Sequence, residues 1–300
     1  MEPNVNDPQV SRDPHAAEGV AGEAAGQPEA SAAPRATDRA VFSVRGLEFS
    51  YPGDHKGCRK RIFGGLDLDL REGVVTTLIG ANGSGKSTLF NLLTKNLVPD
   101  AGQILLRGGN VADMRLSDFA RLVAIVHQNN VAPADLTVER LVRYGRVPFS
   151  GPLAPADRDE DERWVHWALA TTHLLELADR PIGALSGGQR QRAWLAMSLA
   201  QGSDVLLLDE PTTFLDIRYQ LQLLRLVREL NRQFGLTVIM VLHDVNQAMR
   251  YSDEIVALAH GRIVAQGAPD DVVTPALMRE VYGVGLEVAN VGGRPFVLTV

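Results

Sequence analysis

The 300-residue sequence has little cysteine and no long apolar run. Its one thiol, Cys58, excludes a disulfide within the chain and is typical of a reducing compartment. No apolar run approaches the ~18 residues that a membrane-spanning helix needs. The N-terminus also lacks the charged-then-apolar pattern of a secretion signal. We therefore expect a cytosolic protein, which would need a partner to act at a membrane.

Positive and negative charges nearly balance outside the N-terminal tail. The formal net charge is −6, and residues 1–38 hold seven acidic and two basic side chains, which leaves −1 for the rest. A nearly neutral body gives no reason to expect a nucleic-acid partner. The tail is rich in Ala, Pro, Glu and Gly and has almost no large apolar side chains, so it cannot offset its ordering entropy. We predict that residues 1–38 form a disordered acidic tail.

After the tail, strand and helix patterns alternate. Strand-like alternation or buried apolar runs occur at residues 41–44, 47–49, 66–70, 74–79, 122–126, 205–208 and 237–242. Helical patterns occur at residues 86–95, 158–177 and 217–234, and a short hairpin is expected at 254–265. This alternation predicts an α/β fold with a mainly parallel sheet. Residues 131–200 show helical segments without a convincing strand, which indicates an inserted helical subdomain.

A phosphate-binding loop follows the apolar run at residues 74–79. The loop consists of Gly80, Ala81, Asn82, Gly83, Ser84, Gly85, Lys86, Ser87 and Thr88, and it matches G-x-x-x-x-G-K-[ST]. Its glycines allow a tight turn that points N–H groups at phosphate oxygens, and the following helix start adds partial positive charge. We expect Lys86 to reach the β- and γ-phosphates and Ser87 to ligate Mg²⁺. The sequence thus predicts a nucleotide site, with ATP as the nucleotide.

Two adjacent carboxylates end the apolar run at residues 205–208. Asp209 would lie at the carboxyl end of a buried strand, beside the Mg²⁺. Glu210 would abut the γ-phosphate, where a base can polarise the attacking water. Solvated turn residues are the alternative interpretation. The phosphate loop in the same chain favours the catalytic one.

A second glycine-rich helix start follows Leu185. Ser186, Gly187, Gly188 and Gln189 could form another N–H cradle for an anion, with the Ser186 hydroxyl as a further donor. Taken alone, small residues at a helix start would suffice as an explanation. A second such cradle in a chain that already has a phosphate loop calls for a further explanation.

Together, the loop, the run at 185–189 and the Asp209-Glu210-Pro211 strand end resemble the ATPase subunit of an ABC transporter, over roughly residues 41–282. The resemblance implies a P-loop NTPase core with an N-terminal antiparallel β subdomain. It implies an ATPase domain at 39–282, with its helical subdomain at about 131–200, and a strand extension at 283–300. It also implies a homodimer stacked head to tail, in which residues 186–189 contact the nucleotide of the opposite copy.

The resemblance assigns further residues. Tyr51 would stack on adenine, Gln128 would contact Mg²⁺ and water, and His243 would bridge the γ-phosphate and Glu210. Asp216 would help to join the two copies. Phe214 departs from the small residue usual two positions before that aspartate. The basic stretch at residues 54–61 is also unusual, and we interpret it as a solvated loop, with contact to lipid head groups or a partner as the alternative.

Finer motifs resemble the ATPases of iron-siderophore, haem and cobalamin importers. They lie at residues 144–149, 211–217, 242–248 and 282–284. The resemblance implies a peripheral protein on the cytoplasmic side of the cell membrane, bound to permease subunits and linked through them to a solute-binding protein. Residues 144–149 would face the permease. Other transporter classes stay open as an alternative. A soluble ABC ATPase fits less well, because such proteins usually carry two cassettes or long coiled coils. A P-loop kinase or GTPase also fits less well, because it leaves residues 185–189 unexplained.

Overall fold

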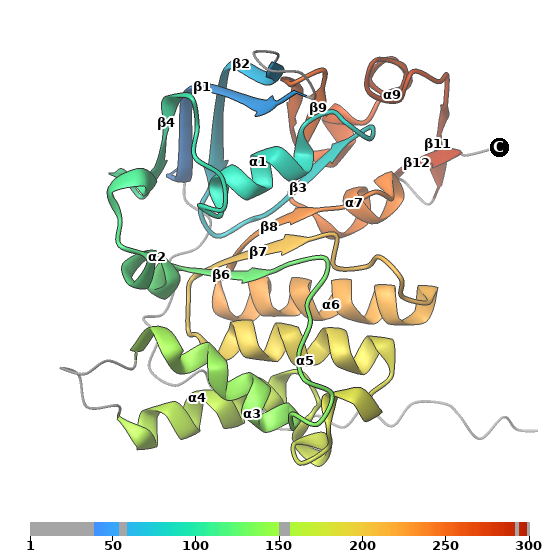
Figure 1. Ribbon diagram of the computed structural model, residues 1–300. Helices are drawn as coiled ribbons and strands as arrows, with labels where there is room; N and C mark the ends of the chain where they lie inside the picture. The colour runs from blue at the N-terminus through green and yellow to red at the C-terminus, as the bar shows by residue number, and fades with distance from the viewer. Residues whose placement is uncertain (1–38, 54–58, 150–156, 292–293, 299–300) are drawn as a thin grey trace, which may run out of the picture.

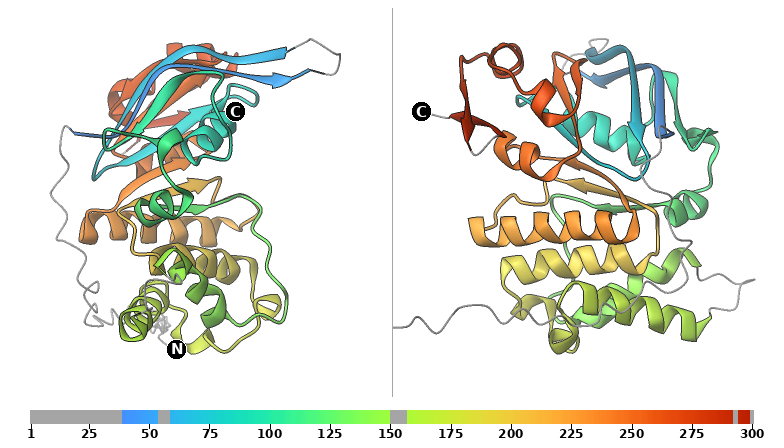
Figure 2. Two further views of the ribbon diagram at one scale, coloured as in Figure 1. Left: turned by 60° about the vertical axis from the view of Figure 1, so that its left-hand side comes forward. Right: turned by 180° about the vertical axis from the view of Figure 1, so that it is seen from behind.

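The structure is a computed structural model that describes residues 39–53, 59–149, 157–291 and 294–298. The predicted acidic tail and Cys58 lie outside the described residues. Two sheets and a set of helices form layers (Figure 1). An antiparallel sheet covers helix α1 (Lys86–Leu93), which packs on one face of a larger sheet, and further helices stack beneath the other face. The views in Figure 2 show the same order of layers.

The antiparallel sheet has the strand order β2-β1-β4-β5. Its bounds are β1 (Ala40–Pro52), β2 (Arg59–Arg71), β4 (Ala101–Leu106) and β5 (Gly109–Asn110). Residues 59–61 of the basic stretch therefore belong to a strand, and the expectation of a loop is wrong for them. They pair with residues 50–52 of β1. The sequence did not indicate β4, because three of its six residues are exposed and its apolar run is short.

The larger sheet has the order β10-β9-β3-β8-β7-β6, and only β10 runs antiparallel to its neighbour. Its bounds are β3 (Val75–Gly80), β6 (Val123–Val126), β7 (Val205–Asp209), β8 (Thr237–Val241), β9 (Glu254–Ala259) and β10 (Arg262–Gly267). The predicted parallel α/β fold and the hairpin at 254–265 are confirmed. The hairpin is also part of the main sheet, since β9 pairs in parallel with β3.

Side chains from the sheet enter two separate cores. Along β7, Val205 and Leu207 join the core shared with α1 and the antiparallel sheet, whereas Leu206 and Leu208 face the helices below. Neighbouring strand residues point to opposite faces, so a strand buried on both sides must be apolar throughout. This explains why the central strands were readable as continuous apolar runs.

The helices below the sheet are α3 (Val138–Arg143), α4 (Arg158–Thr171), α5 (Gly187–Ala200) and α6 (Ile217–Phe234). Helix α4 ends six residues earlier than predicted. The Thr172 hydroxyl donates to the Ala168 carbonyl at 2.8 Å, and His173 has a φ of 56°. This left-handed residue stops the helix, and a 3₁₀ turn (Leu175–Leu177) follows. Among the described residues of 131–200, the one β pairing is an isolated bridge between Thr137 and Pro181.

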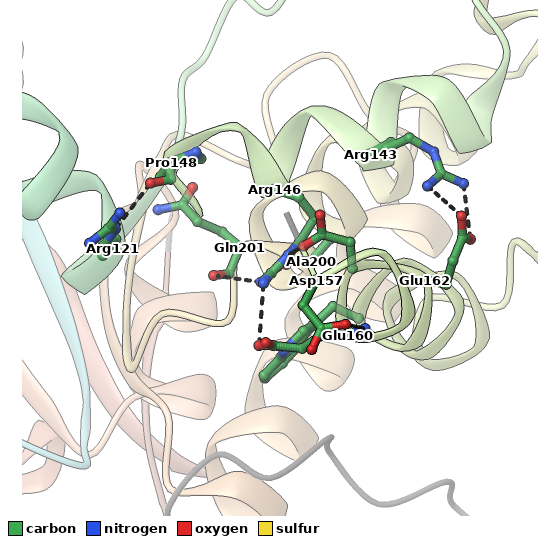
Figure 3. Close-up of polar contacts among 11 residues, drawn as sticks. Arg121, Arg143, Arg146, Pro148, Asp157, Glu160, Glu162, Ala200 and Gln201 are labelled. Atoms are coloured by element: carbon green, nitrogen blue, oxygen red, sulfur yellow. Dashed lines mark hydrogen bonds and ion pairs between the residues drawn. The ribbon is translucent and has the colours of Figure 1, made fainter. Parts of the chain in front are cut away.

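A buried arginine holds these helices together. Arg146, in a 3₁₀ helix (Tyr144–Phe149), is 3 % exposed and donates to Asp161 at 2.6 Å and to the Ala200 carbonyl at 3.0 Å. Figure 3 shows Arg146 reaching toward Glu160 and the end of α5, with Arg143 paired to Glu162 nearby. A buried charge is stable only when it is paired and hydrogen-bonded, so this cluster fixes the shape of the helical layer.

Shorter elements complete the chain. They are a 3₁₀ helix (Val111–Asp113), α2 (Leu116–Leu122), a 3₁₀ helix (Ile182–Ala184), α7 (Val245–Tyr251), α8 (Pro269–Val272), α9 (Pro275–Tyr282), β11 (Glu287–Val291) and β12 (Arg294–Leu298). The last two form the terminal strand pair expected from the sequence. No helix in the described part of the chain has the length and apolarity needed to span a bilayer.

Candidate nucleotide site

Four parallel strands deliver the predicted site residues to one edge of the sheet. Strand β3 ends at Gly80 and β7 at Asp209, while Gln128 and His243 follow β6 and β8 by two residues each. These strands are neighbours in the order β3-β8-β7-β6. Ligands of open α/β sheets bind outside the carboxyl ends of the strands. The topology therefore gathers residues that are up to 163 positions apart in the sequence, from Gly80 to His243.

The loop after β3 has the backbone that its glycines predict. Gly83 has a φ of 79°, and Gly85 has a φ of 111° at the residue before α1. A Cβ at Gly85 would also lie 2.9 Å from the Phe63 ring, so a side chain is excluded there by space as well as by conformation. The first N–H groups of α1 have no partner within the helix and point into the loop. This arrangement suits phosphate oxygens.

Polar side chains in the loop are poised for a ligand. Lys86 is 5 % exposed, and its ammonium donates to the carbonyls of Gly80 at 2.7 Å and Ala81 at 3.1 Å. Burial lowers the pKa of Lys86, against the attraction of Glu210 and Asp209. The Ser84 hydroxyl is buried without a hydrogen-bond partner. A buried polar group without a partner is costly, so an acceptor in the loop would relieve it.

Glu210 is the centre of a hydrogen-bonded cluster. Its carboxylate accepts from Gln128 Nε2 at 2.5 Å and lies 2.6 Å from His243 Nε2. The Thr213 hydroxyl donates to it at 3.2 Å. Glu210 has a φ of 47°, an uncommon conformation for a residue with a side chain, which places backbone strain at this position. Sequence reasoning did not identify this contact of Thr213, because the second of two threonines after Pro211 carries no motif of its own.

Asp209, at the carboxyl end of β7, has a strongly shifted pKa. Burial first, and then the adjacent Glu210 carboxylate, raise the pKa of Asp209 to about 6, although His243 and Lys86 oppose the rise. Desolvation and a like charge both disfavour the ionised form. Perturbed carboxyl groups in such positions are frequent at functional sites.

Replacing Asp209 by asparagine should therefore stabilise the ligand-free protein at neutral pH. The folded-state pKa lies above the ordinary value of 3.8, so the penalty for the charged form is absent below pH 3.8 and complete above about 6. After allowance for partial solvent contact, we expect the free energy of unfolding to rise by about 1 kcal/mol at pH 7.5 and by only a small fraction of that at pH 4. Urea unfolding at both pH values measures this difference.

Asp253 provides the matched control. Burial raises the pKa of Asp253, but hydrogen bonds from Arg228 and the Val75 amide bring it below its ordinary value. Asp253→Asn should thus lower the free energy of unfolding at pH 7.5. Equal signs for the two variants would contradict the electrostatic description of Asp209.

The donors at this edge suit a magnesium ion that is held partly by a nucleotide. Asp209 offers a carboxylate oxygen, Ser87 an exposed hydroxyl, and Gln128 a carbonyl oxygen opposite the amide that it gives to Glu210. Among the described residues, no three His, Cys, Asp or Glu side chains gather as a metal site. Mg²⁺ is commonly held by one or two carboxylates with phosphates and waters, so this sparse set fits it.

Tyr51 lies beside the phosphate loop. Its hydroxyl is 3.4 Å from the Thr88 hydroxyl, and its ring meets the edge of Phe49 with the centroids 4.9 Å apart. The side chain is 36 % exposed, so part of its ring is open to solvent. This geometry suits an aromatic surface for a base next to the phosphates.

The structure does not bring Ser186 and its neighbours to the loop of the same chain. Their helix α5 packs in the core below the main sheet, whereas α1 packs above it (Figure 1). Ser186 caps α5 and shares a capping box with Gln189, while a Cβ at Gly188 would lie 2.5 Å from the Tyr219 ring. Gly187 is exposed, and a Cβ there would meet only ordinary contact. Packing therefore explains Gly188, but it does not explain Gly187.

The family model and the relatives that match this chain agree with one another. The model of the ABC transporter family matches residues 63–213. The ferric enterobactin transport ATP-binding protein of Escherichia coli is 45 % identical over 235 residues, covering 78 % of this chain and 86 % of that protein. The iron(3+)-hydroxamate import ATP-binding protein of Bacillus subtilis is 44 % identical, covering 75 % and 83 %. The hemin import ATP-binding protein of Streptomyces coelicolor is 42 % identical, covering 78 % and 82 %.

Solved structures agree with these relatives. The cbiO1 protein of Clostridium perfringens, part of the ABC transporter complex cbiONQ, is 30 % identical with a TM-score of 0.68, covering 78 % of this chain and 90 % of that one. A transporter described as of the metal-chelate type, in an inward-facing conformation, is 26 % identical with a TM-score of 0.72, covering 86 % and 96 %.

Proposed function

The chain belongs to the ABC transporter family of ATP-binding subunits, whose ATP hydrolysis is coupled to transport, and we propose that it powers the import of an iron chelate, haem or cobalamin. The main support for the ATPase assignment is the Glu210 carboxylate. Gln128 and His243 hold it at the carboxyl ends of the strands, where the phosphate loop also lies. The import assignment is supported by the names of relatives at 42–47 % identity.

The proposed site uses the residues at the strand edge. Tyr51 stacks on adenine, and the backbone N–H groups of residues 80–88 together with Lys86 bind the phosphates. Ser87, Asp209 and Gln128 would hold Mg²⁺, which when bound supplies positive charge to the phosphate oxygens. Glu210 takes a proton from the attacking water, and His243 orients that carboxylate through its 2.6 Å contact. Gln128 holds the second carboxylate oxygen at 2.5 Å.

The site is complete only in a pair of chains under this proposal. Ser186, Gly187, Gly188 and Gln189 of one copy contact the nucleotide on the loop of the other, and Asp216 contributes to the joint between them. The exposed Gly187, which packing does not explain, supports this arrangement. ATP binds the closed pair better than the open one, and hydrolysis removes that preference, so the cycle shifts the population between two states of the transporter.

Residues 39–282 form the ATPase domain in this proposal, with a helical subdomain at about 131–200 and a strand extension at 283–300. A groove of about 370 Å³ in the helical layer is lined by Arg140, Arg143, Tyr144, Arg146, Val147 and Asp161. Tyr144 and Val147 are 54 % and 58 % exposed beside it. We assign this surface to the permease, which in turn meets a solute-binding protein. The chain then acts as a peripheral subunit at the cytoplasmic face of the membrane.

Replacing Tyr144 by aspartate should separate the chain from its permease and leave its own ATPase activity within about twofold. An exposed aromatic side chain in a groove is the type of residue that dominates an interface, and a charge there is costly to bury. The measurement is affinity purification of the tagged chain from detergent-extracted membranes, with the co-purifying membrane protein identified by mass spectrometry.

Val98→Asp is the matched control, because Val98 is 76 % exposed and lies outside this groove. It should keep the permease bound. Co-purification of a polytopic importer subunit with the control, and its loss from Tyr144→Asp, supports the assignment. Co-purification of an exporter subunit would assign the chain to the alternative transporter class. Recovery of the permease in equal amounts by both variants would refute the docking surface.

A further inference from the structure

Two side-chain amides, one buried and one half-buried, join two segments that flank Glu210. Gln247 on α7 donates through Nε2 to Gln220 Oε1 on α6 at 2.7 Å. Gln220 in turn donates through Nε2 to the Leu215 carbonyl at 2.8 Å. Gln247 is 7 % exposed and Gln220 is half-buried, so the bond between them is partly shielded from solvent. We propose that Gln220 and Gln247 form an amide bridge that positions residues 213–216 against the helix that begins beside His243.

The direction of the bridge is fixed by chemistry. The Leu215 carbonyl can only accept, so Gln220 must turn its NH₂ group toward it and its own carbonyl toward Gln247. Gln247 must then present its NH₂ group, which leaves its carbonyl oxygen buried without a partner. The bridge thus leaves a buried acceptor without a protein partner. Such exceptions call for a specific explanation, and positioning is the one that this geometry supplies.

Each of the two segments that the bridge joins lies next to a residue that contacts the Glu210 carboxylate. Residues 213–216 begin at Thr213, whose hydroxyl donates to Glu210 at 3.2 Å. Helix α7 is capped by Asp244, which accepts from the amides of Asn246 and Gln247, and His243 directly precedes that cap. His243 contacts the other Glu210 oxygen at 2.6 Å. The contacts close a ring that runs through Glu210, and a shift at any point of the ring acts on the others.

Residues 213–216 need such support. Phe214 has a φ of 64° and is 88 % exposed, a combination that is uncommon for a bulky residue. Backbone in this region persists only where the surroundings hold it. The bridge supplies that hold through the next residue, Leu215. The segment is therefore presented outward in a fixed shape while its base touches Glu210.

This inference rests on the proposed function, in which residues near 216 meet a second copy of the chain. The bridge then carries the position of that contact to α7 and to His243, and so couples closure of the pair to the orientation of Glu210. A coupling of this kind lowers turnover when it is cut, but it leaves binding of ATP to a single loop intact. Gln220 and Gln247 are thus positioning residues, since neither contacts the phosphate loop.

The test replaces each glutamine by methionine, which keeps the length of the side chain and removes its hydrogen bonds. We expect kcat to fall about five- to twentyfold in either variant, with the dissociation constant for ATP within about twofold of the parent. The double variant should be no slower than the slower single one, because both changes cut the same bridge. Hydrolysis by the purified full chain and binding of a fluorescent ATP analogue supply the numbers.

Asn246→Ala is the control from the same helix. Asn246 exchanges two hydrogen bonds with the Val297 backbone, at 3.0 and 2.8 Å, and takes no part in the bridge through its side chain. The kcat of Asn246→Ala should stay within about twofold of the parent, even if its melting temperature falls. Unchanged kcat in both glutamine variants, additive losses in the double variant, or an equal loss in Asn246→Ala would each overturn the bridge. A parent chain without ATP hydrolysis would instead refute the proposed function.

Discussion

Replacing Glu210 by glutamine should reduce ATP turnover by two to three orders of magnitude while ATP binding persists. A positioned general base contributes about 10²–10⁴-fold to a rate, and an amide cannot take the proton from water. The substitution keeps the size of the side chain, so Gln128 and Thr213 retain a hydrogen-bond partner. The phosphate loop is untouched, because its contacts come from residues 80–88.

Steady-state phosphate release and titration with a fluorescent ATP analogue measure the two quantities separately. Glu229→Gln is the matched control, since Glu229 is an exposed glutamate on α6 far in sequence from the strand edge. It should hydrolyse ATP at the parental rate. Near-parental turnover in Glu210→Gln would contradict the assignment of the base, and a loss of ATP binding would show that Glu210 has a structural role instead.

Replacing Ser186 by arginine should abolish hydrolysis nearly as completely, by about 100-fold or more, without weakening ATP binding to the separate chain. Helix α5 lies below the main sheet, so the new side chain cannot reach the loop of its own copy. In the proposed pair it would enter the space of the other copy's phosphates and prevent closure. Removing donors that act only in the assembled site lowers kcat by about 10²–10³-fold.

The loss of a helix cap has to be separated from this effect. Ser186 caps α5, and Thr137 caps α3 in the same way by accepting from the Arg140 amide. Either substitution should therefore lower stability by about 1 kcal/mol. Thr137→Arg should nevertheless retain hydrolysis. If both variants lost activity alike, the cause would be the cap and not a contact between copies. Parental turnover in Ser186→Arg would refute the shared site.

The order and type of the central elements were predictable from the sequence because burial on both faces leaves an unmistakable apolar run. The runs at 205–208 and 237–242 correspond to β7 and β8, and both place their polar ends at the site. Strands β4 and β5 were missed, since they are short and partly exposed. The end of α4 was missed because one left-handed residue, His173, stops a pattern that otherwise continues.

The candidate site was predictable where a motif fixes the backbone and much less so where side chains meet across strands. The loop at 80–88 and the pair Asp209 and Glu210 follow from local patterns. The contacts of Glu210 with Thr213 and the bridge from Gln220 to Gln247 depend on how helices pack after folding, and no spacing in the sequence encodes them. The roles of residues 186–189 also stay predictions, because one chain contains only half of the proposed site.

The most direct test of the shared nucleotide site is the molar mass of Glu210→Gln in solution, measured by light scattering with and without ATP. A shared site predicts a mass of one 32.5 kDa chain without nucleotide and twice that mass with ATP, with two nucleotides bound per pair. Adding Ser186→Arg to the same chain should restore the single-chain mass. A mass that stays at that of one chain in saturating ATP would contradict the shared site.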